Sequence, residues 1–413
     1  MLRFVDRFAL QVITFGCFGT LFLFRPSTWL HTLTFFLGAG LVVFSADFRS
    51  RWKALFCQSE LLWIAWPFLT WFVVAFSLVL IHGTSFRFGF PENAFRMALA
   101  LPILCFVVHA KVKQSFYLGL IVAACAALAW CVYERQYLGV MRSEATTNNP
   151  IHFGNLTALL ALICLTVSLM ASQLDKNLRR LILCASALAA LASVSSLSRS
   201  SAILLLCAWP LLRLSREDAF IKRIKILLAV LLVALIGLIG FSSQVREGLR
   251  IHEFTAAFKN PEGIDYERLT GDRGNMWHAA TLMFVSHPWV GVGPGGFSSN
   301  FQALIDGGVV KKTAMHNQPH NDILNAASGG GAFKLLSYLA LIGGPFVFFF
   351  RRYKSRADVE DKLFPLLGMQ VVGAFVLTGL TNSNFDLQIY STMYAVLVCV
   401  LAKLCLELEG PHE

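Results

Sequence analysis

The sequence predicts an all-α integral membrane protein with about twelve transmembrane helices, each of roughly 20 residues. The chain is 56% hydrophobic and only 14% charged, whereas soluble domains carry about 25% charged residues. Apolar runs of spanning length recur along most of the 413 residues. Because backbone polar groups in lipid must pair within their own segment, these runs are expected to be helical.

Most of the expected spans precede one large loop, and the last three follow it. The fourth and eighth are short for a bilayer and are compatible with tilted, kinked or partly re-entrant helices. The chain then divides into spans one to nine at 1–242, a loop at 243–332, and spans ten to twelve with the tail at 333–413. The expected spans are about 8–24, 28–46, 61–81, 94–109, 116–133, 151–171, 178–195, 200–214, 224–242, 333–350, 363–381 and 387–406.

The distribution of basic residues predicts the orientation in the membrane. Lysine and arginine concentrate in segments expected on the same side as the N-terminus. By the positive-inside rule, both termini are cytoplasmic and residues 243–332 lie outside, in the periplasm if the cell is Gram-negative. The net charge of +11 then reflects topology, and nucleic-acid binding is not expected. The lysine and arginine residues of the short outer loops are Arg25, Arg87, Arg135, Arg142 and Arg199.

The cysteines and the N-terminal run carry little functional signal. None of the ten cysteines lies in 243–332, so neither a disulfide framework nor a cysteine-based metal site is expected. The first apolar run lacks a small-residue cleavage site, which favours a retained first span over a signal peptide.

The outer loop is expected to contain short helices. Residues 244–259 have the spacing of an amphipathic helix. Residues 272–286 also have helical spacing, with Asp272 as N-cap and a His-Pro pair as the stop. A glycine-rich turn is expected at 291–297.

Residues 316–325, His-Asn-Gln-Pro-His-Asn-Asp-Ile-Leu-Asn, gather titratable and amide side chains beside a membrane-length run. Pro319 suits the first position of a short helix that ends near Gly329. His320 and Asn321 would then lie in a first turn, whose free N–H groups favour anions.

The two histidines of this segment have three open interpretations. The i, i+4 spacing of His316 and His320 is that of a metal pair, but Pro319 interrupts it and a His-Glu-x-x-His pattern is absent. Histidine is also a common structural residue. The functional interpretation is general acid–base catalysis, because an imidazole titrates near neutral pH.

Two arginines of the outer segments are candidate anion ligands. Arg199 lies among serines at the junction of spans seven and eight, and Arg273 lies four residues before Trp277 on one helix face. A guanidinium binds phosphate oxygens in a bidentate manner. The alternatives are an arginine that snorkels to lipid headgroups and a surface arginine stacked on a tryptophan.

Two further basic features have less definite roles. Arg142 lies in a polar outer segment that leads through Asn149-Pro150 to His152, and this segment is either an ordinary turn or a ligand contact. Arg96 lies inside the fourth expected span, where an arginine is expected to pair with an acid or to line a cavity.

Taken together, these segments resemble the O-antigen ligase and polymerase superfamily of bacterial envelope glycosyltransferases. The resemblance consists of an ordered set of motifs between about 130 and 333 and of the long loop between spans nine and ten. In the family pattern His-x-His-Asn, Gln318 replaces the first histidine, which leaves His320 as the matching base. The matching residues are Arg142, Asn149, Pro150, Ser198, Arg199, Ser200, Arg273, Trp277, Pro288, Gly291, Gly293, His320, Asn321, Asp322 and Gly329.

Within this superfamily, the length, the single loop and the lack of a C-terminal soluble domain look most like an O-antigen ligase with a GT-C-like fold. Such an enzyme transfers polysaccharide from undecaprenyl diphosphate to the core sugar of lipid A. The implied partners are this lipid-linked donor, the lipid A-core acceptor and membrane lipids. The implied location is the bacterial inner membrane, with a periplasmic active site.

The residues suit this chemistry. Negative charge builds on the lipid diphosphate as it leaves, and a cation must stabilise it. Arg199 and Arg273 are expected to do so without a metal, and His320 is expected to take the proton of the acceptor hydroxyl. No cofactor is expected, because the donor is already activated. The expected supporting residues are Arg142, Trp277, His316, Asn321 and Asp322.

Other functions remain open at this stage. O-antigen polymerases and protein O-oligosaccharyltransferases share the donor chemistry and differ in the acceptor. A transporter of lipid-linked sugars also suits twelve spans. It predicts charged or broken helices at the midplane and internal pseudo-symmetry, whereas the polar residues here concentrate in one external loop.

Overall fold

The computed structural model describes residues 2–18, 26–84, 91–107, 110–207, 272–311 and 313–406. Within these ranges every regular element is helical. Six of the helices are long and apolar enough to cross a membrane, or seven if one bent pair counts as a single span. The protein is therefore an all-α, multi-pass membrane protein.

Helices occupy the predicted spans wherever the chain is described. The predicted ninth span and the predicted amphipathic helix at 244–259 lie outside the described residues. The total of twelve spans stays a prediction. The helices in these positions are α1 (Leu2–Phe15), α2 (Pro26–Phe44), α4 (Leu62–Ile81), α6 (Glu92–Ala100), α7 (Ala110–Tyr137), α8 (Pro150–Met170), α9 (Lys176–Ser195), α10 (Arg199–Leu206), α18 (Asp322–Ser355), α19 (Leu363–Gly379) and α20 (Gln388–Leu406).

The fourth predicted span is a short, broken helix. The α-helix α6 gives way at Ala100 to the 3-10 helix η2 (Leu101–Cys105), which has Pro102 in its first turn. Proline lacks the N–H that would continue an α-helix and clashes with the carbonyl four residues earlier. Arg96 of α6 pairs with Glu92 at 2.6 Å and donates to the Thr32 hydroxyl at 2.8 Å. The expectation that Arg96 pairs with an acid is therefore confirmed.

The helix α3 (Ala46–Cys57) is charged and lies between the second and third predicted spans, where no helix was predicted. The axis of α3 is bent by 101° from His31–Phe44 of α2. Ser45 ends the first helix and caps the second, because its Oγ accepts from the Phe48 N–H at 3.3 Å. The α3 helix therefore runs across the bundle end instead of continuing the span.

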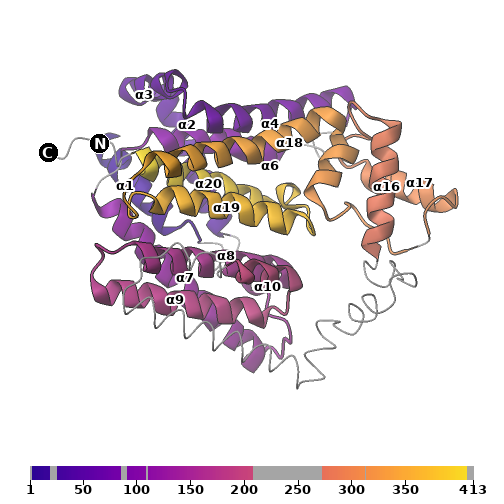
Figure 1. The fold of residues 1–413 in the computed structure, drawn as a ribbon. Coiled ribbons are helices and arrows are strands. Elements are labelled where there is room, and N and C mark those ends of the chain that lie inside the picture. Colours follow the sequence, from indigo (N-terminus) through magenta and orange to yellow (C-terminus); the bar gives the residue numbers. More distant parts are fainter. Residues whose placement is uncertain are drawn as a thin grey trace.

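The core of the bundle is built around α8. In the most apolar stretch of α8, every residue is buried inside the protein. In the corresponding stretch of α9, only 28% of the residues are buried. A helix that is apolar on every side can face either lipid or the protein interior, and the packing of α8 places it in the interior. Figure 1 shows the long helices side by side, with α16 and α17 at one end of the bundle and α3 at the other.

The described part of the outer loop has its own small core. The helix α16 (Asp272–Ser286) confirms the helix predicted for 272–286 and ends before the His-Pro pair, but Asp272 lies in its first turn and not at the N-cap. The helix α17 (Phe297–Asp306) was not predicted. Met276 of α16 and Phe301 of α17 are both buried in the cluster that joins the two helices.

The glycine-rich segment docks onto a break in α18. Gly331 has φ 61° and ψ −157°, which interrupts the helix. The interruption removes helical partners from backbone groups. Val292 N–H donates to Ser328 O at 2.8 Å, and Ala332 N–H donates to Pro288 O at 2.7 Å. The turn predicted at 291–297 is thus confirmed. This segment supplies hydrogen-bond partners for the backbone groups at the break in α18.

The predicted helix from Pro319 to Gly329 is wrong in its start and in its end. The helix begins at Asp322, because the Asn321 side chain caps it by accepting from the Leu324 N–H at 3.0 Å. His320 precedes the cap in a left-handed conformation with φ 51°, so it does not lie in the first helical turn. At the other end the helix runs past Gly329 to the break at Gly331.

Replacing Gly331 by alanine is expected to destabilise the protein. An L-residue at positive φ costs about 1–2 kcal/mol, and a Cβ at Gly331 would overlap the Trp289 carbonyl group. We expect a lower melting temperature of the detergent-purified protein, measured by fluorescence-detected gel filtration after heating. Gly329→Ala is the control, because that glycine lies two residues away with nothing within 4 Å of its Cβ position. Equal melting temperatures for the two variants would contradict the strain argument.

Candidate functional site

The 316–321 segment is held against α16. The Nε2 atom of His316 lies 3.2 Å from Asp272 Oδ2. Trp277 donates its Nε1–H to the Pro319 carbonyl at 3.0 Å. The rings of His316 and His320 are nearly perpendicular, with centroids 6.0 Å apart. The first and second turns of α16 therefore fix the backbone on the N-terminal side of His320.

A second support comes from the turn between α19 and α20, residues 380–386. Asn321 Nδ2 donates to Leu380 O at 3.1 Å, and the Phe385 N–H donates to Asp322 Oδ1 at 3.3 Å. Arg273 donates from Nη2 to Thr381 O at 3.1 Å. The 380–386 turn thus joins α16 to the 316–325 segment, and it brings Arg273, Asn321 and Asp322 together.

Sequence reasoning missed the 380–386 turn. Its signal was Thr381-Asn382-Ser383-Asn384, a run of polar residues directly after an apolar span. Buried amides must be paired. Asn382 Nδ2 donates to Asn384 Oδ1 at 2.9 Å, and Asn384 Nδ2 donates to the Thr378 hydroxyl at 2.9 Å. These buried hydrogen bonds give the turn a defined shape where it contacts the 316–325 segment.

The surroundings of His320 favour its neutral form. Burial lowers the pKa of the imidazole below its usual value of 6.5, and the positive charges of Arg273 and His316 lower it further. A hydrogen bond with Asn382 raises this pKa and opposes the other effects. The net lowering leaves His320 neutral near pH 7, which is the form that accepts a proton.

Two arginines form a positive region beside His320. Burial lowers the pKa of the Arg273 guanidinium, and the positive charge of Arg199 lowers it further. Both guanidinium groups stay charged at neutral pH. Arg273 is half-buried and Arg199 is exposed at the start of α10. Because like charges in proximity are unfavourable, the pair is suited to hold an anion with more than one negative charge.

Arg142 belongs to a turn that packs beside the Arg199 segment. Its Nε donates to the Ser196 carbonyl at 3.2 Å. The Glu134 carboxylate anchors the same turn by accepting from the Ala145 N–H at 2.6 Å. The structure therefore places Arg142 near the segment that carries Arg199. Its bond to Ser196 O gives it an anchoring contact in this position.

A polar network that joins α8 and α20 lies beside the His320 cluster. The His152 ring packs edge-on against Tyr390, with centroids 5.2 Å apart, and it interacts electrostatically with His320. Asn155 donates from Nδ2 to the Tyr390 hydroxyl at 3.2 Å and accepts from the Ser200 hydroxyl at 2.7 Å. His152, which the sequence only suggested, is thus a neighbour of the His320 cluster.

Metal ligation was one interpretation of the histidine pair. Across the described ranges, no group of three or more His, Cys, Asp or Glu residues is arranged to hold a metal ion. His316 instead faces Asp272. Metal independence remains a prediction for the experiments below.

Comparison with known protein families identifies a match over part of the chain. Residues 184–339 match a family model described as O-antigen ligase. The match covers the candidate residues on α10, α16 and the 316–325 segment, and it excludes Arg142 and the 380–386 turn. No curated protein matches the chain significantly. Residues 184–339, less than half of the chain, are thus similar to the O-antigen ligase family.

Proposed function

We propose that this protein is an O-antigen ligase that transfers polysaccharide from undecaprenyl diphosphate to the lipid A-core oligosaccharide. The observation that carries the proposal is the gathering of a half-buried His320, whose pKa is lowered, with Arg273 and Arg199 within the segment that matches the family model. A proton acceptor beside a pair of fixed cations suits the displacement of a diphosphate by a sugar hydroxyl.

The proposed reaction is a single displacement that inverts the anomeric centre. The acceptor hydroxyl oxygen forms a bond to the anomeric carbon, and the bond from that carbon to the diphosphate oxygen breaks. The hydroxyl proton passes to His320. Both electrons of the broken bond leave with undecaprenyl diphosphate, whose charge Arg199 and Arg273 stabilise in place of a metal ion.

The remaining predicted residues act by positioning. Trp277 and Asn321 hold the backbone on either side of His320 through the Pro319 and Leu380 carbonyls. Asp322 fixes the 380–386 turn through the Phe385 N–H. His316 lowers the pKa of His320 further. Arg142 anchors the turn beside Arg199.

The proposed topology has twelve spans in the bacterial inner membrane, with both termini in the cytoplasm. The candidate site would then face the periplasm. Support comes from the distribution of lysine and arginine along the sequence and from the position of α16 and α17 together at one end of the helix bundle (Figure 1).

The test is complementation of a Gram-negative strain that lacks its own ligase and whose core and O-antigen the enzyme accepts. Lipopolysaccharide is separated on a gel after expression of the wild type, His320→Ala or His278→Ala. His278 is exposed on α16 and serves as the matched control. Long-chain ladders are expected with the wild type and the control, and only core bands with His320→Ala.

The other outcomes have definite meanings. Ladders with His320→Ala would keep the ligase assignment and discard His320 as the base. Wild-type protein that is present in the membrane but gives no ladder would contradict ligation with these substrates. An assay for polymerised O-antigen on the carrier, or for glycosylated protein, would then identify the acceptor.

Transfer by the purified protein is expected to persist in excess EDTA. The physical reason is that Arg199 and Arg273 supply the positive charge that a divalent cation supplies in other transferases. Initial rates are measured with and without EDTA, and again after addition of Mg²⁺ or Mn²⁺. A rate that vanishes with the chelator and returns with either metal would contradict the arginine clamp.

A further inference from the structure

An exposed apolar surface lies at the end of α16 and in the turn that follows it. Val285, in the last turn of α16, is 69% exposed, and Trp289 is 66% exposed. The Trp289 ring packs against the ring of Phe333 on α18, which is itself 52% exposed, with centroids 6.1 Å apart. Exposed apolar groups that gather in one place mark a contact with a membrane or a partner. We call Val285, Trp289 and Phe333 the Trp289 patch.

The backbone of Trp289 is fixed to α18. The Phe333 N–H donates to the Trp289 carbonyl at 3.4 Å, next to the bond from the Ala332 N–H to the Pro288 carbonyl. A Cβ at Gly331 would overlap the Trp289 carbonyl group, so the two segments are in close contact. The height of Trp289 along the axis of the bundle is therefore set by the position at which the long apolar part of α18 begins.

The helix α4 shows where this height lies in a membrane. It has 20 residues, none of them charged. At 1.5 Å per residue its length is about 30 Å, which matches the hydrocarbon thickness of a typical bilayer. His82 directly follows α4, and its Nε2 atom lies 3.1 Å from the Val290 carbonyl. The residue after Trp289 thus contacts the point at which α4 leaves the hydrocarbon layer.

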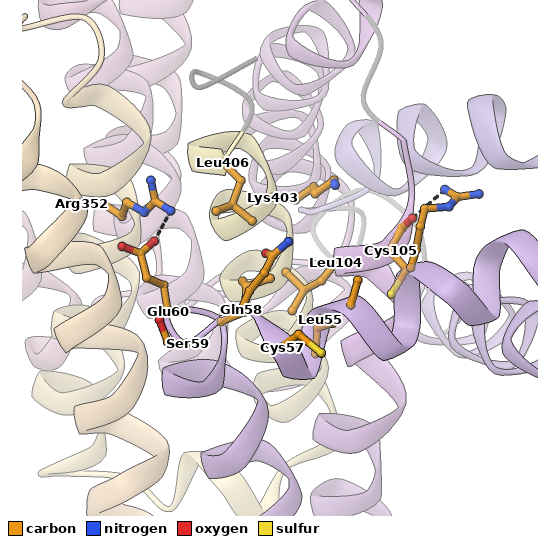
Figure 2. Close-up of a pocket in the computed structure, with 13 residues that line it drawn as sticks. Leu55, Cys57, Gln58, Ser59, Glu60, Leu104, Cys105, Arg352, Lys403 and Leu406 are labelled. Carbon is orange, nitrogen blue, oxygen red and sulfur yellow. Dashed lines mark hydrogen bonds and ion pairs between the residues drawn. The ribbon is translucent and has the colours of Figure 1, made fainter. Parts of the chain in front are cut away.

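The opposite ends of α4 and α18 carry a charged pair. Figure 2 shows Arg352, near the end of α18, beside Glu60, which precedes α4, and the two side chains form an ion pair. Arg352 is separated from Phe333 by about 29 Å of helix at 1.5 Å per residue. The apolar parts of both spans lie between these two levels. The Trp289 patch is therefore at the boundary between acyl chains and headgroups on the α16 side.

Lipid is the partner that fits this patch. Leu336 and Leu339 of α18 are exposed as well, so the patch continues into the apolar surface of a helix that is long enough to cross a membrane. Tryptophan is enriched at membrane–water interfaces, because its ring is apolar and its N–H is polar. Figure 1 shows α16 running across the ends of the long helices. A helix in this position lies in the interface plane.

We propose that the Trp289 patch inserts into the leaflet on the α16 side, which is the outer leaflet in the proposed topology. The Trp289 ring lies at the level of the lipid glycerol groups, with Val285 and Phe333 against the acyl chains. Arg273 lies on the same helix as Val285. The anchor thereby holds Arg273 near the level of the lipid phosphates, and this consequence rests on the proposed function, whereas the insertion itself does not.

The experiment measures tryptophan fluorescence of the full-length protein in vesicles of phosphatidylcholine. Because the chain has nine tryptophans, the Trp289 signal is taken as the difference between the wild type and Trp289→Tyr. Tyrosine keeps an interfacial aromatic ring at this position. Phosphatidylcholine brominated near the glycerol end of its acyl chains is expected to quench the Trp289 signal strongly. Lipid brominated near the chain ends is expected to quench it less, and aqueous iodide least.

Trp71→Phe provides the matched control signal. Trp71 lies on α4 against the rings of Tyr338 and Phe385, is only 3% exposed, and its Nε1 atom has no hydrogen-bond partner that the substitution would remove. Its signal is expected to be quenched far less by either brominated lipid. A Trp289 signal that iodide quenches strongly and that both brominated lipids leave unchanged would overturn the insertion.

Transfer assays test the consequence for Arg273. Trp289→Ser is expected to lose rate several-fold with lipid-linked donor in vesicles, and less with a short-chain, water-soluble donor in detergent, where height in a bilayer has no effect. Trp289→Tyr is expected to keep the rate in both assays. Equal losses for Trp289→Ser in both would overturn the link between the anchor and Arg273. Absence of transfer by the wild type would count against the proposed function alone, because the fluorescence measurement decides the insertion without any activity.

Discussion

Replacing His320 by asparagine is expected to lower the rate of transfer by about 100- to 10,000-fold, the range that general base catalysis contributes. Asparagine lacks a titrating nitrogen. It also tolerates the left-handed backbone better than alanine does, and His320 has φ 51°. The variant should therefore remain folded, and the loss should reflect the missing base. Single-turnover rates with lipid-linked donor, beside the melting temperature, measure both quantities.

The pH dependence provides an independent check on this role. Burial, Arg273 and His316 together place the pKa of His320 below 6.5. The base is active when neutral, so the wild-type rate should rise with pH through this lowered pKa and level off by neutral pH. His316→Gln removes one of the positive charges that lower it. The acidic limb of the variant should therefore move to higher pH.

Three results would contradict the assignment. Wild-type rates for His320→Asn would exclude the side chain as the base. An acidic limb that stays in place in His316→Gln would show that His316 does not influence the titrating group. A shift of the limb in the exposed His278→Ala control would show that the profile is not specific to the cluster.

Replacing Arg199 or Arg273 by alanine is expected to lower the rate by about 100- to 1,000-fold each, as for the loss of one donor to a developing oxyanion. The double variant is expected to lose less than the product of the two, because both groups bind one diphosphate and their effects are coupled. Arg→Lys variants should recover only part of the rate. Lysine keeps the charge but lacks the planar fork of donors.

Arg135→Ala is the matched control for the arginine pair. Arg135 is exposed at the end of α7, and its contact is with the Ser195 carbonyl at 3.4 Å, near the Arg199 segment. Rates as a function of donor concentration separate binding from chemistry. A clamp that acts on the leaving diphosphate should lower kcat as well as raise KM. Loss in the control equal to that in Arg199→Ala would point to general surface charge instead.

Part of the site could be predicted from the sequence, because its signals are local. His320, Asn321 and Asp322 are adjacent in one polar segment. The helical spacing that places Arg273 and Trp277 on one face also lies within four residues, and α16 confirms the helix. The helix start at Asp322 was mispredicted, because Asn321 caps the helix where proline was expected to begin it.

The 380–386 turn could not be placed beside the site from the sequence. Its bond from Asn321 to Leu380 joins residues 59 apart, and its bond from Arg273 to Thr381 joins residues 108 apart. No local pattern encodes such distances. A polar cavity among α3, η2 and the ends of α18 and α20 could not be predicted either, because its lining comes from four separate segments.

That the protein is helical and crosses a membrane can be read from its sequence alone, because the requirement to pair backbone groups in lipid acts within each apolar segment. The residue types available for the chemistry are also evident there. Which of these residues meet depends on the fold, because packing of α16, α18 and the 380–386 turn sets the distances between them. The resulting burial and neighbouring charges lower the pKa of His320, and this environment exists only in the folded protein.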